Sequence, residues 1–163
     1  SNLAVTHDAV STGASMISGA VFISYASEDL SAVQRIHQGL DEAGVDAWFD
    51  KKRLDPGDLY DQKIKRNISQ CSYFIPVISR AALKREKGYF RKEWLLGAEE
   101  SHQYAVDRPF IFPVLLDGLR RDEVTGVPPE FGATHWTSAQ DGQLPPEFIQ
   151  HMRQLIRQAQ KRS

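Results

Sequence analysis

The sequence predicts an α/β fold, in which an open parallel sheet carries helices on both faces, and three observations support this. Apolar runs typical of strands alternate with helical patterns five times along the chain. Two of these runs, residues 72–78 and 109–116, are almost unbroken, which is typical of strands that are covered on both faces. The length of 163 residues suits one domain with a single core.

The first strand, helix and strand are expected in residues 20–49. Residues 20–25 are apolar up to Ser24, and a helix follows because apolar side chains recur at helical spacing from Leu30 to Ala43. Gly44 comes directly after this pattern, where a glycine commonly ends a helix. Residues 46–49 then form the second strand.

The rest of the chain continues the alternation. A charged loop, residues 51–58, contains an Asp-Pro-Gly turn, and Asp58 is a candidate N-cap for the next helix. Further helices are expected over residues 89–102 and from Pro145 to about Ala159. Residues 117–132 are irregular with room for a short helix, and the other strands are expected at 72–78, 109–116 and 134–137.

Composition limits the domain organisation and the partners. Residues 1–19 are small and polar, so we expect a flexible leader before one domain at residues 20–160. The net charge of -1 gives no reason to expect nucleic acid as a partner. No apolar run approaches the roughly 20 residues that span a bilayer, so no membrane partner is expected. The single cysteine, Cys71, fits a reducing compartment, and we expect a cytoplasmic location.

Three segments, taken in order, carry a resemblance to a known family. These are Val-Phe-Ile-Ser-Tyr at 21–25, the loop at 51–58 and the helix at 89–102. Together they resemble a Toll/interleukin-1 receptor (TIR) domain, particularly the bacterial type that cleaves NAD. The resemblance implies a flavodoxin-like sheet of order B-A-C-D-E, with strands lettered A to E along the chain. It covers residues 20–137 and extends less closely to about 160.

The helix at 89–102 carries the candidate catalytic residue. Glu93 matches the family's catalytic glutamate, and Tyr89, one turn earlier, matches an aromatic residue that stacks on nicotinamide and is more often Trp. A carboxylate suits this chemistry because positive charge develops on the ribose as the bond to nicotinamide breaks. Helical periodicity alone favours the other interpretation, in which Glu93 is a solvated glutamate that pairs loosely with nearby basic side chains.

The resemblance also implies a substrate pocket and an assembly loop. Residues that match the pocket follow the first two strands or lie in the loop, namely Phe22, Ser24, Tyr25, Asp50, Arg53 and Leu54. The loop that joins neighbouring TIR domains in the family corresponds to Lys51, Lys52, Arg53, Asp55, Pro56 and Gly57. Charge alone would make the first three of these a solvated turn.

The expected function is therefore that of an NAD nucleosidase, an enzyme for which NAD is the substrate and which needs no cofactor. It would release nicotinamide and either ADP-ribose or a cyclic ADP-ribose, and it would be activated by self-assembly into a homo-oligomer or filament in bacterial antiphage signalling or toxicity. The chain lacks the glycine-rich phosphate loops and the metal-ligand spacing of other nucleotide enzymes, and no metal is expected. The alternative is a non-enzymatic signalling or scaffold module that acts through TIR–TIR contacts.

Overall fold

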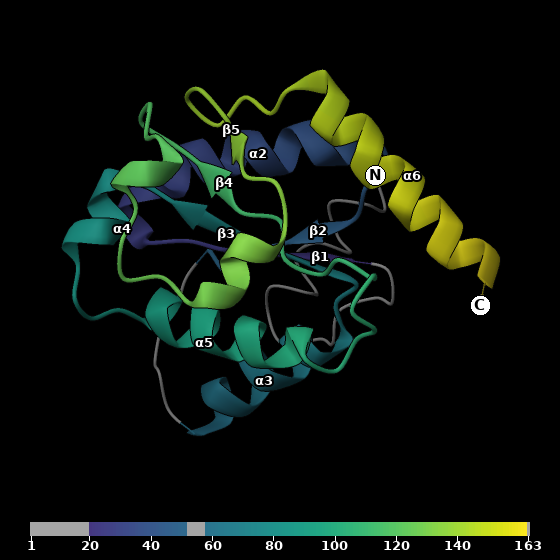
Figure 1. The fold of residues 1–163 in the computed structure, drawn as a ribbon, viewed down its shortest axis with the longest axis horizontal. Helices are drawn as coiled ribbons and strands as arrows, with labels where there is room; N and C mark the ends of the chain where they lie inside the picture. The colour runs from purple at the N-terminus through teal and green to yellow at the C-terminus, as the bar shows by residue number, and fades with distance from the viewer. Residues whose placement is uncertain (1–19, 52–57, 163) are drawn as a thin grey trace.

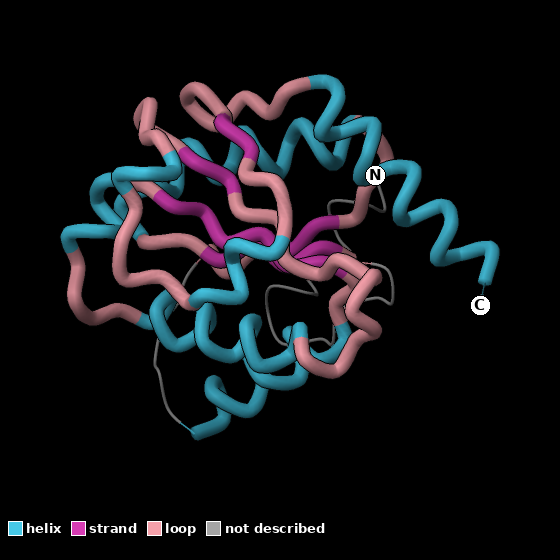
Figure 2. The backbone as a smooth tube through the Cα atoms, in the orientation of Figure 1, coloured by secondary structure: helices cyan, strands magenta, loops and turns pink. Residues whose placement is uncertain are grey.

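The computed structural model describes residues 20–51 and 58–162, and its centre is a five-stranded parallel sheet of order β2-β1-β3-β4-β5 (Figures 1 and 2). Every neighbouring pair in the sheet is parallel. The order B-A-C-D-E expected from the sequence is confirmed. The strands are β1 Val21–Ser24, β2 Ala47–Trp48, β3 Tyr73–Ile78, β4 Val114–Leu115 and β5 Thr137–Ser138.

Helices cover both faces of the sheet, as expected (Figure 1). The helices α2, Leu30–Glu42, and α6, Pro146–Arg162, lie on one face. The helices α3, Asp58–Gln70, and α5, Tyr89–Ser101, lie on the other. Because side chains alternate along a strand, β1 contributes to both apolar layers and is buried throughout.

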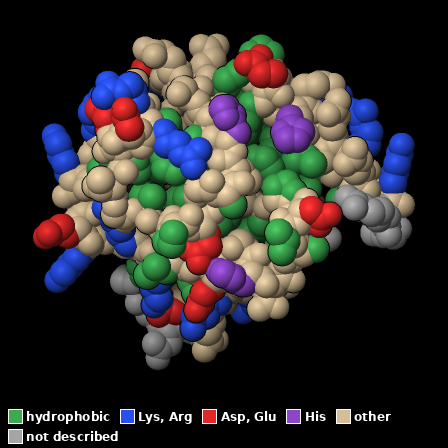
Figure 3. Space-filling model, in the orientation of Figure 1, with side chains coloured by type: hydrophobic (Ala, Val, Ile, Leu, Met, Phe, Trp, Pro, Cys, Tyr) green, Lys and Arg blue, Asp and Glu red, His purple; other side chains and the backbone are tan. Residues whose placement is uncertain are grey.

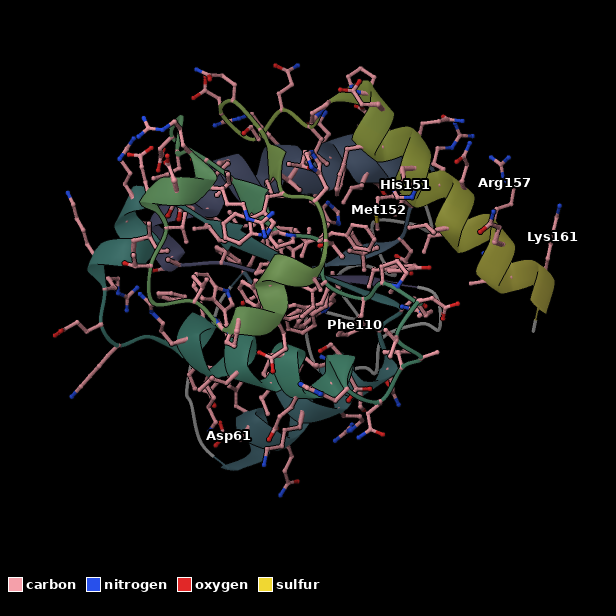
Figure 4. The ribbon with its side chains drawn as sticks, in the orientation of Figure 1. Asp61, Phe110, His151, Met152, Arg157 and Lys161 are labelled. Carbon is pink, nitrogen blue, oxygen red and sulfur yellow. The ribbon has the colours of Figure 1, made fainter. Side chains whose placement is uncertain are left out.

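Helix α6 buries only part of its length. Met152 lies toward the sheet and is fully buried, whereas Arg157 and Lys161 stand on the portion that projects from the body of the domain (Figures 1 and 4). Among the described residues, no helix is long and apolar enough to cross a membrane.

Short helices follow two of the strands. The 3-10 helix η1, Ser27–Asp29, precedes α2, so the helix expected directly after β1 opens with a 3-10 turn. Helix α4, Arg80–Lys84, was not expected from the sequence. It begins at Ser79, whose hydroxyl accepts a 3.0 Å hydrogen bond from the amide of Ala82.

The last two strands are shorter than the sequence segments in which they were expected. Over residues 109–116 the sheet pairing consists of an isolated bridge at Ile111 and the two residues of β4, with Pro113 between them. Proline has no amide hydrogen to donate, although the Pro113 carbonyl accepts from the Thr137 amide at 3.0 Å. Strand β5 starts at Thr137, where the run expected at 134–137 ends.

Two more 3-10 helices, η2 Arg121–Glu123 and η3 Pro129–Ala133, lie in the stretch expected to be irregular. Gly44 has a positive φ of 80° directly after α2, which confirms its place at the end of that helix. The leader expected at residues 1–19 and loop residues 52–57 lie outside the described residues.

Candidate active site

Glu93 lies in the second turn of α5 and is 1% exposed. Its Oε1 accepts a hydrogen bond of 2.6 Å from the hydroxyl of Ser24. A buried carboxylate is uncommon unless other groups satisfy it, because burial removes its hydration. Glu93 is therefore not the solvated helix glutamate that periodicity alone allowed.

The sheet geometry explains why Ser24 meets Glu93. Ser24 is the last residue of β1, and it lies on the strand face that α5 covers, together with Phe22. Ligands in open α/β sheets bind at the carboxyl ends of the strands, so Ser24 and Glu93 meet at the edge where a ligand is expected.

Phe22 is part of the core below this edge. Its ring lies 5.0 Å from that of Trp48 and 5.6 Å from that of Phe74, measured between centroids, and the residue is 1% exposed. The structure therefore places Phe22 in the apolar layer under Ser24. A role in the predicted substrate pocket would be to support its floor.

Tyr25 and Asp50 meet on the opposite face of the sheet. The Tyr25 hydroxyl donates to the backbone carbonyl of Asp50 at 2.6 Å, and its ring packs edge-on against Phe49 at 5.8 Å. Tyr25 and Asp50 are both buried, whereas Lys51, directly after Asp50, is exposed. This contact ties the end of β1 to the point where the charged loop begins.

Tyr89 lies one turn before Glu93, as expected, and its half-buried ring faces α3. It meets the ring of Tyr60 edge-on at 4.9 Å, and the ammonium group of Lys92 lies 5.7 Å from its centroid. Lys92 in turn pairs with Asp61 at 2.9 Å. Figure 4 shows Asp61 near the start of α3. The predicted aromatic residue is thus next to the helix that follows the charged loop.

The remaining predicted residues are on that loop. Lys52, Arg53, Leu54, Asp55, Pro56 and Gly57 lie outside the described residues, so their part in a pocket or an assembly stays a prediction. The described ends of the loop are Asp50 after β2 and Asp58 at the start of α3.

Two more carboxylates, those of Asp29 and Asp117, lie at the same edge of the sheet. Asp29 accepts a short hydrogen bond from the hydroxyl of Ser79, and Asp117 accepts one of 2.9 Å from the amide of Arg80. Burial raises the pKa of Asp29, and the Ser79 hydroxyl opposes that rise. The nearby charges of Asp117 and Glu28 add to it.

Arg91 is a residue that sequence reasoning missed. Its guanidinium donates to the backbone carbonyls of Arg85, Gly126 and Ala82 at 3.1, 2.8 and 3.1 Å, and so holds the end of α4 and the loop at Gly126 beside the start of α5. Since carbonyl partners have no side-chain signature and one of them lies 35 residues away, the sequence carries no local signal for this role.

A separate pocket of about 500 Å³ lies at the amino edge of the sheet. Its lining includes Tyr104, Arg108, Phe110 and Glu130, and Figure 4 shows Phe110 near the centre of the view. The pocket borders the end of α5 and the segment that leads into β4, so it is remote from Glu93. Within residues 20–51 and 58–162, no group of three or more His, Cys, Asp or Glu side chains could hold a metal ion.

Comparison with known proteins identifies relatives by sequence. The chain is 31% identical over 80 residues to the 2' cyclic ADP-D-ribose synthase AbTIR of Acinetobacter baumannii. The aligned segment covers 48% of this chain and 30% of that protein. It is 29% identical over 101 residues to the 2' cyclic ADP-D-ribose synthase BtTIR of Bacteroides thetaiotaomicron, covering 61% of this chain and 35% of that protein. The chain thus spans about a third of the length of these curated relatives.

The fold and the family profile agree with these matches. A metazoan TIR-STING receptor from C. gigas, solved in complex with 2',3'-cGAMP, superposes with a TM-score of 0.60 at 27% identity, over 86% of this chain and 39% of that one. The family profile described as TIR domain matches residues 21–156. Since this match covers most of the chain and the sheet has the expected strand order, the chain belongs to the TIR domain family.

Proposed function

We propose that this TIR domain cleaves NAD between the ribose and nicotinamide, with Glu93 as the catalytic carboxylate. The observation that carries the proposal is the burial of Glu93 at the carboxyl edge of the sheet, with Oε1 bonded to Ser24 at 2.6 Å. Its position on α5 is the one that the family resemblance assigned to catalysis. Burying a carboxylate is costly. Such groups are therefore common at functional sites, where their chemistry is needed.

The chemistry requires little more than this carboxylate. As the ribose–nicotinamide bond lengthens, positive charge develops on the ribose, and a fixed negative charge nearby stabilises that state. Nicotinamide leaves as a neutral base, so its departure needs no strong acid. Charges interact more strongly where water is excluded. Because Glu93 is buried, its effect on the developing charge is strengthened.

The named activities of the relatives support the same reaction class. Both curated relatives are named as 2' cyclic ADP-D-ribose synthases, at 31% and 29% identity. We propose that the products here are nicotinamide and either ADP-ribose or a cyclic ADP-ribose. The product depends on whether water or a hydroxyl of the same ADP-ribose attacks the ribose.

Two further elements complete the proposed site. Tyr89 supplies an aromatic surface one turn from Glu93, on which nicotinamide stacks. The loop between β2 and α3 closes over the substrate when TIR domains associate, so a homo-oligomer or filament is the active form. NAD and other copies of the TIR domain are then the partners.

The proposal is tested by nicotinamide release from NAD at high protein concentration, with Glu93→Gln as the decisive variant. Gln keeps the size of the side chain and removes its charge, so the rate falls by about 100- to 1,000-fold. Glu99→Gln is the matched control, because Glu99 lies on the same helix and is exposed. It should release nicotinamide at the wild-type rate.

Other results would contradict the proposal. If Glu93→Gln kept wild-type activity, the carboxylate would not be catalytic. If the wild-type protein released no nicotinamide even when clustered on a support, the scaffold function through TIR–TIR contacts would take the place of catalysis.

A further inference from the structure

We infer that Ser24 is a positioning residue, which fixes the Glu93 carboxylate for the reaction and acts on the substrate only through it. The inference rests on the proposed function of Glu93. It assigns Ser24 a different role from the direct substrate contact that the family resemblance implied.

The hydrogen bond itself is the first support. A serine hydroxyl has a single hydrogen to donate, and Ser24 donates it to Oε1 of Glu93 at 2.6 Å. This length is typical of a hydroxyl that donates to an ionised carboxylate. Ser24 is also 0% exposed, so its hydroxyl does not lie at an open surface.

The rigidity of β1 is the second support. This strand pairs with β2 on one side and β3 on the other, and Ser24 is in register with Pro76 of β3. Phe22 below it is stacked on the ring of Phe74 and packs at a tilt against the ring of Trp48. A hydroxyl on such a strand is held in one place by the whole sheet.

A fixed hydroxyl matters because a glutamate side chain is otherwise flexible. Ordering its rotatable bonds costs conformational entropy, and a carboxylate that is already ordered stabilises developing charge without reorganising. Helix α5 sets the Cα of Glu93, and Ser24 fixes the far end of the side chain. Ser24 therefore contributes to the rate of the chemical step and little to the binding of NAD.

The test measures kcat and KM for nicotinamide release by Ser24→Ala and Ser24→Cys. Ser24→Ala should lower kcat by roughly 10- to 100-fold, the usual effect of losing a hydrogen bond to a charged group, with KM nearly unchanged. Ser24→Cys keeps a weaker donor of similar shape, so its kcat should lie between those of Ser24→Ala and the wild-type protein.

Ser79→Ala is the matched control. Ser79 follows the neighbouring strand β3 and is also 0% exposed, but its hydroxyl bonds to Asp29 and the amide of Ala82. Removing the Ser79 hydroxyl breaks these two hydrogen bonds but keeps the bond from Ser24 to Glu93, so kcat should stay at the wild-type value. If kcat fell equally in Ser79→Ala, the loss in Ser24→Ala would come from a general loosening of the fold, and the inference would be overturned.

The remaining outcomes separate this inference from the proposed function. An active wild-type protein with an equally active Ser24→Ala overturns the role of Ser24 and leaves catalysis by Glu93 standing. A rise in KM at constant kcat overturns it too, since Ser24 would then be a substrate contact. A wild-type protein that releases no nicotinamide overturns both. If Ser24→Ala does not melt cooperatively, Ser24→Cys carries the same comparison.

Discussion

At the scale of single residues, Glu93 and Asp29 each accept a hydrogen bond from a serine that ends a strand or follows one. They differ in their surroundings. Glu93 lies inside the layer between sheet and α5, whereas Asp29 is half-buried at the edge with Asp117 and Glu28 nearby. Burial, with the like charges adding to it, raises the pKa of Asp29, so its charged form carries a cost in the folded protein.

We predict that Asp29→Asn stabilises the protein at neutral pH. The folded-state pKa of Asp29 is raised above its unfolded value by burial, so wild-type stability falls as pH rises from the usual carboxyl range through that raised pKa. Asn cannot ionise, and its side-chain oxygen still accepts from Ser79. Chemical denaturation at several pH values should show the variant's advantage growing across this window.

The comparison below that window is the internal control. At pH values where Asp29 is protonated in both folded and unfolded chains, the two proteins should differ little. Asp122→Asn, at a carboxylate that is 75% exposed, should show no comparable gain at neutral pH. A loss of stability in Asp29→Asn at pH 7 would mean that the charge strengthens the bond from Ser79 by more than burial costs.

At the scale of elements, the position of α5 depends on Gly97. A Cβ at this position would lie 2.5 Å from Cε2 of Phe74 and 2.7 Å from Cδ2 of the same ring. Phe74 is 0% exposed, so it cannot swing aside. Gly97 is one turn after Glu93 on the same side of the helix, and the close approach of α5 to β3 therefore sets how deep Glu93 lies.

We predict that Gly97→Ala pushes α5 away from the sheet. Overpacking of this kind lowers the free energy of unfolding by about 1–3 kcal/mol, more than the helix propensity of alanine returns. The displaced helix takes Glu93 away from Ser24, so nicotinamide release should fall even where the variant is fully folded. Denaturation and activity assays below the melting transition measure the two effects separately.

Gly39→Ala is the matched control on a helix with more room. The nearest atom to a Cβ at Gly39 is Cδ1 of Ile149 at 3.7 Å, an ordinary contact. Here alanine should raise the free energy of unfolding by about 0.5–1 kcal/mol and leave activity unchanged. If Gly97→Ala were as stable and active as Gly39→Ala, the packing of α5 would not control the site.

The elements also show what could be predicted from the sequence and why. Helix α5 was predicted nearly to its ends because its apolar face repeats at helical spacing, and β3 because its run is continuous. The short β4 was overpredicted, since the core buries residues 110–116 whether or not Pro113 joins the sheet. Helix α4 is too short to leave a periodic pattern.

The candidate site was predicted in part for similar reasons. The resemblance selected Glu93 and Ser24, but their contact joins residues 69 positions apart, and such contacts leave no local signal. The same holds for the packing of Tyr89 against Tyr60 across two helices. Burial of Glu93 follows from Gly97 and Phe74, which fix how closely the helix approaches the sheet.

At the scale of the whole molecule, the surface carries charges of both signs. The face in Figure 3 shows basic and acidic side chains interspersed, in keeping with a net charge of -1. Such a surface does not steer the protein toward a polyanion. The association between copies that we propose would then depend on local features, and the charged loop between β2 and α3 is the one that the sequence singles out.

We predict that activity depends on association through this loop. Closure of a loop over the substrate excludes water and completes the site, so specific activity should rise with protein concentration. Arg53→Ala and Gly57→Val should remove that rise, because the Asp-Pro-Gly sequence predicts Gly57 at the turn position that favours a positive φ, where a branched side chain is strained. Light scattering and nicotinamide release over a concentration series measure both effects on the same samples.

Folding should be nearly unaffected by these two changes, since the described residues already form the five-stranded sheet and both apolar layers. Arg120→Ala is the matched control for Arg53→Ala, because the Arg120 side chain is 72% exposed and, within the described part of the chain, forms ion pairs with Asp122 and Glu123 close by. It should associate and cleave NAD as the wild-type protein does. Loss of cooperative melting in Arg53→Ala or Gly57→Val would show that the loop stabilises the fold, and activity independent of concentration would show that a single copy already contains the complete site.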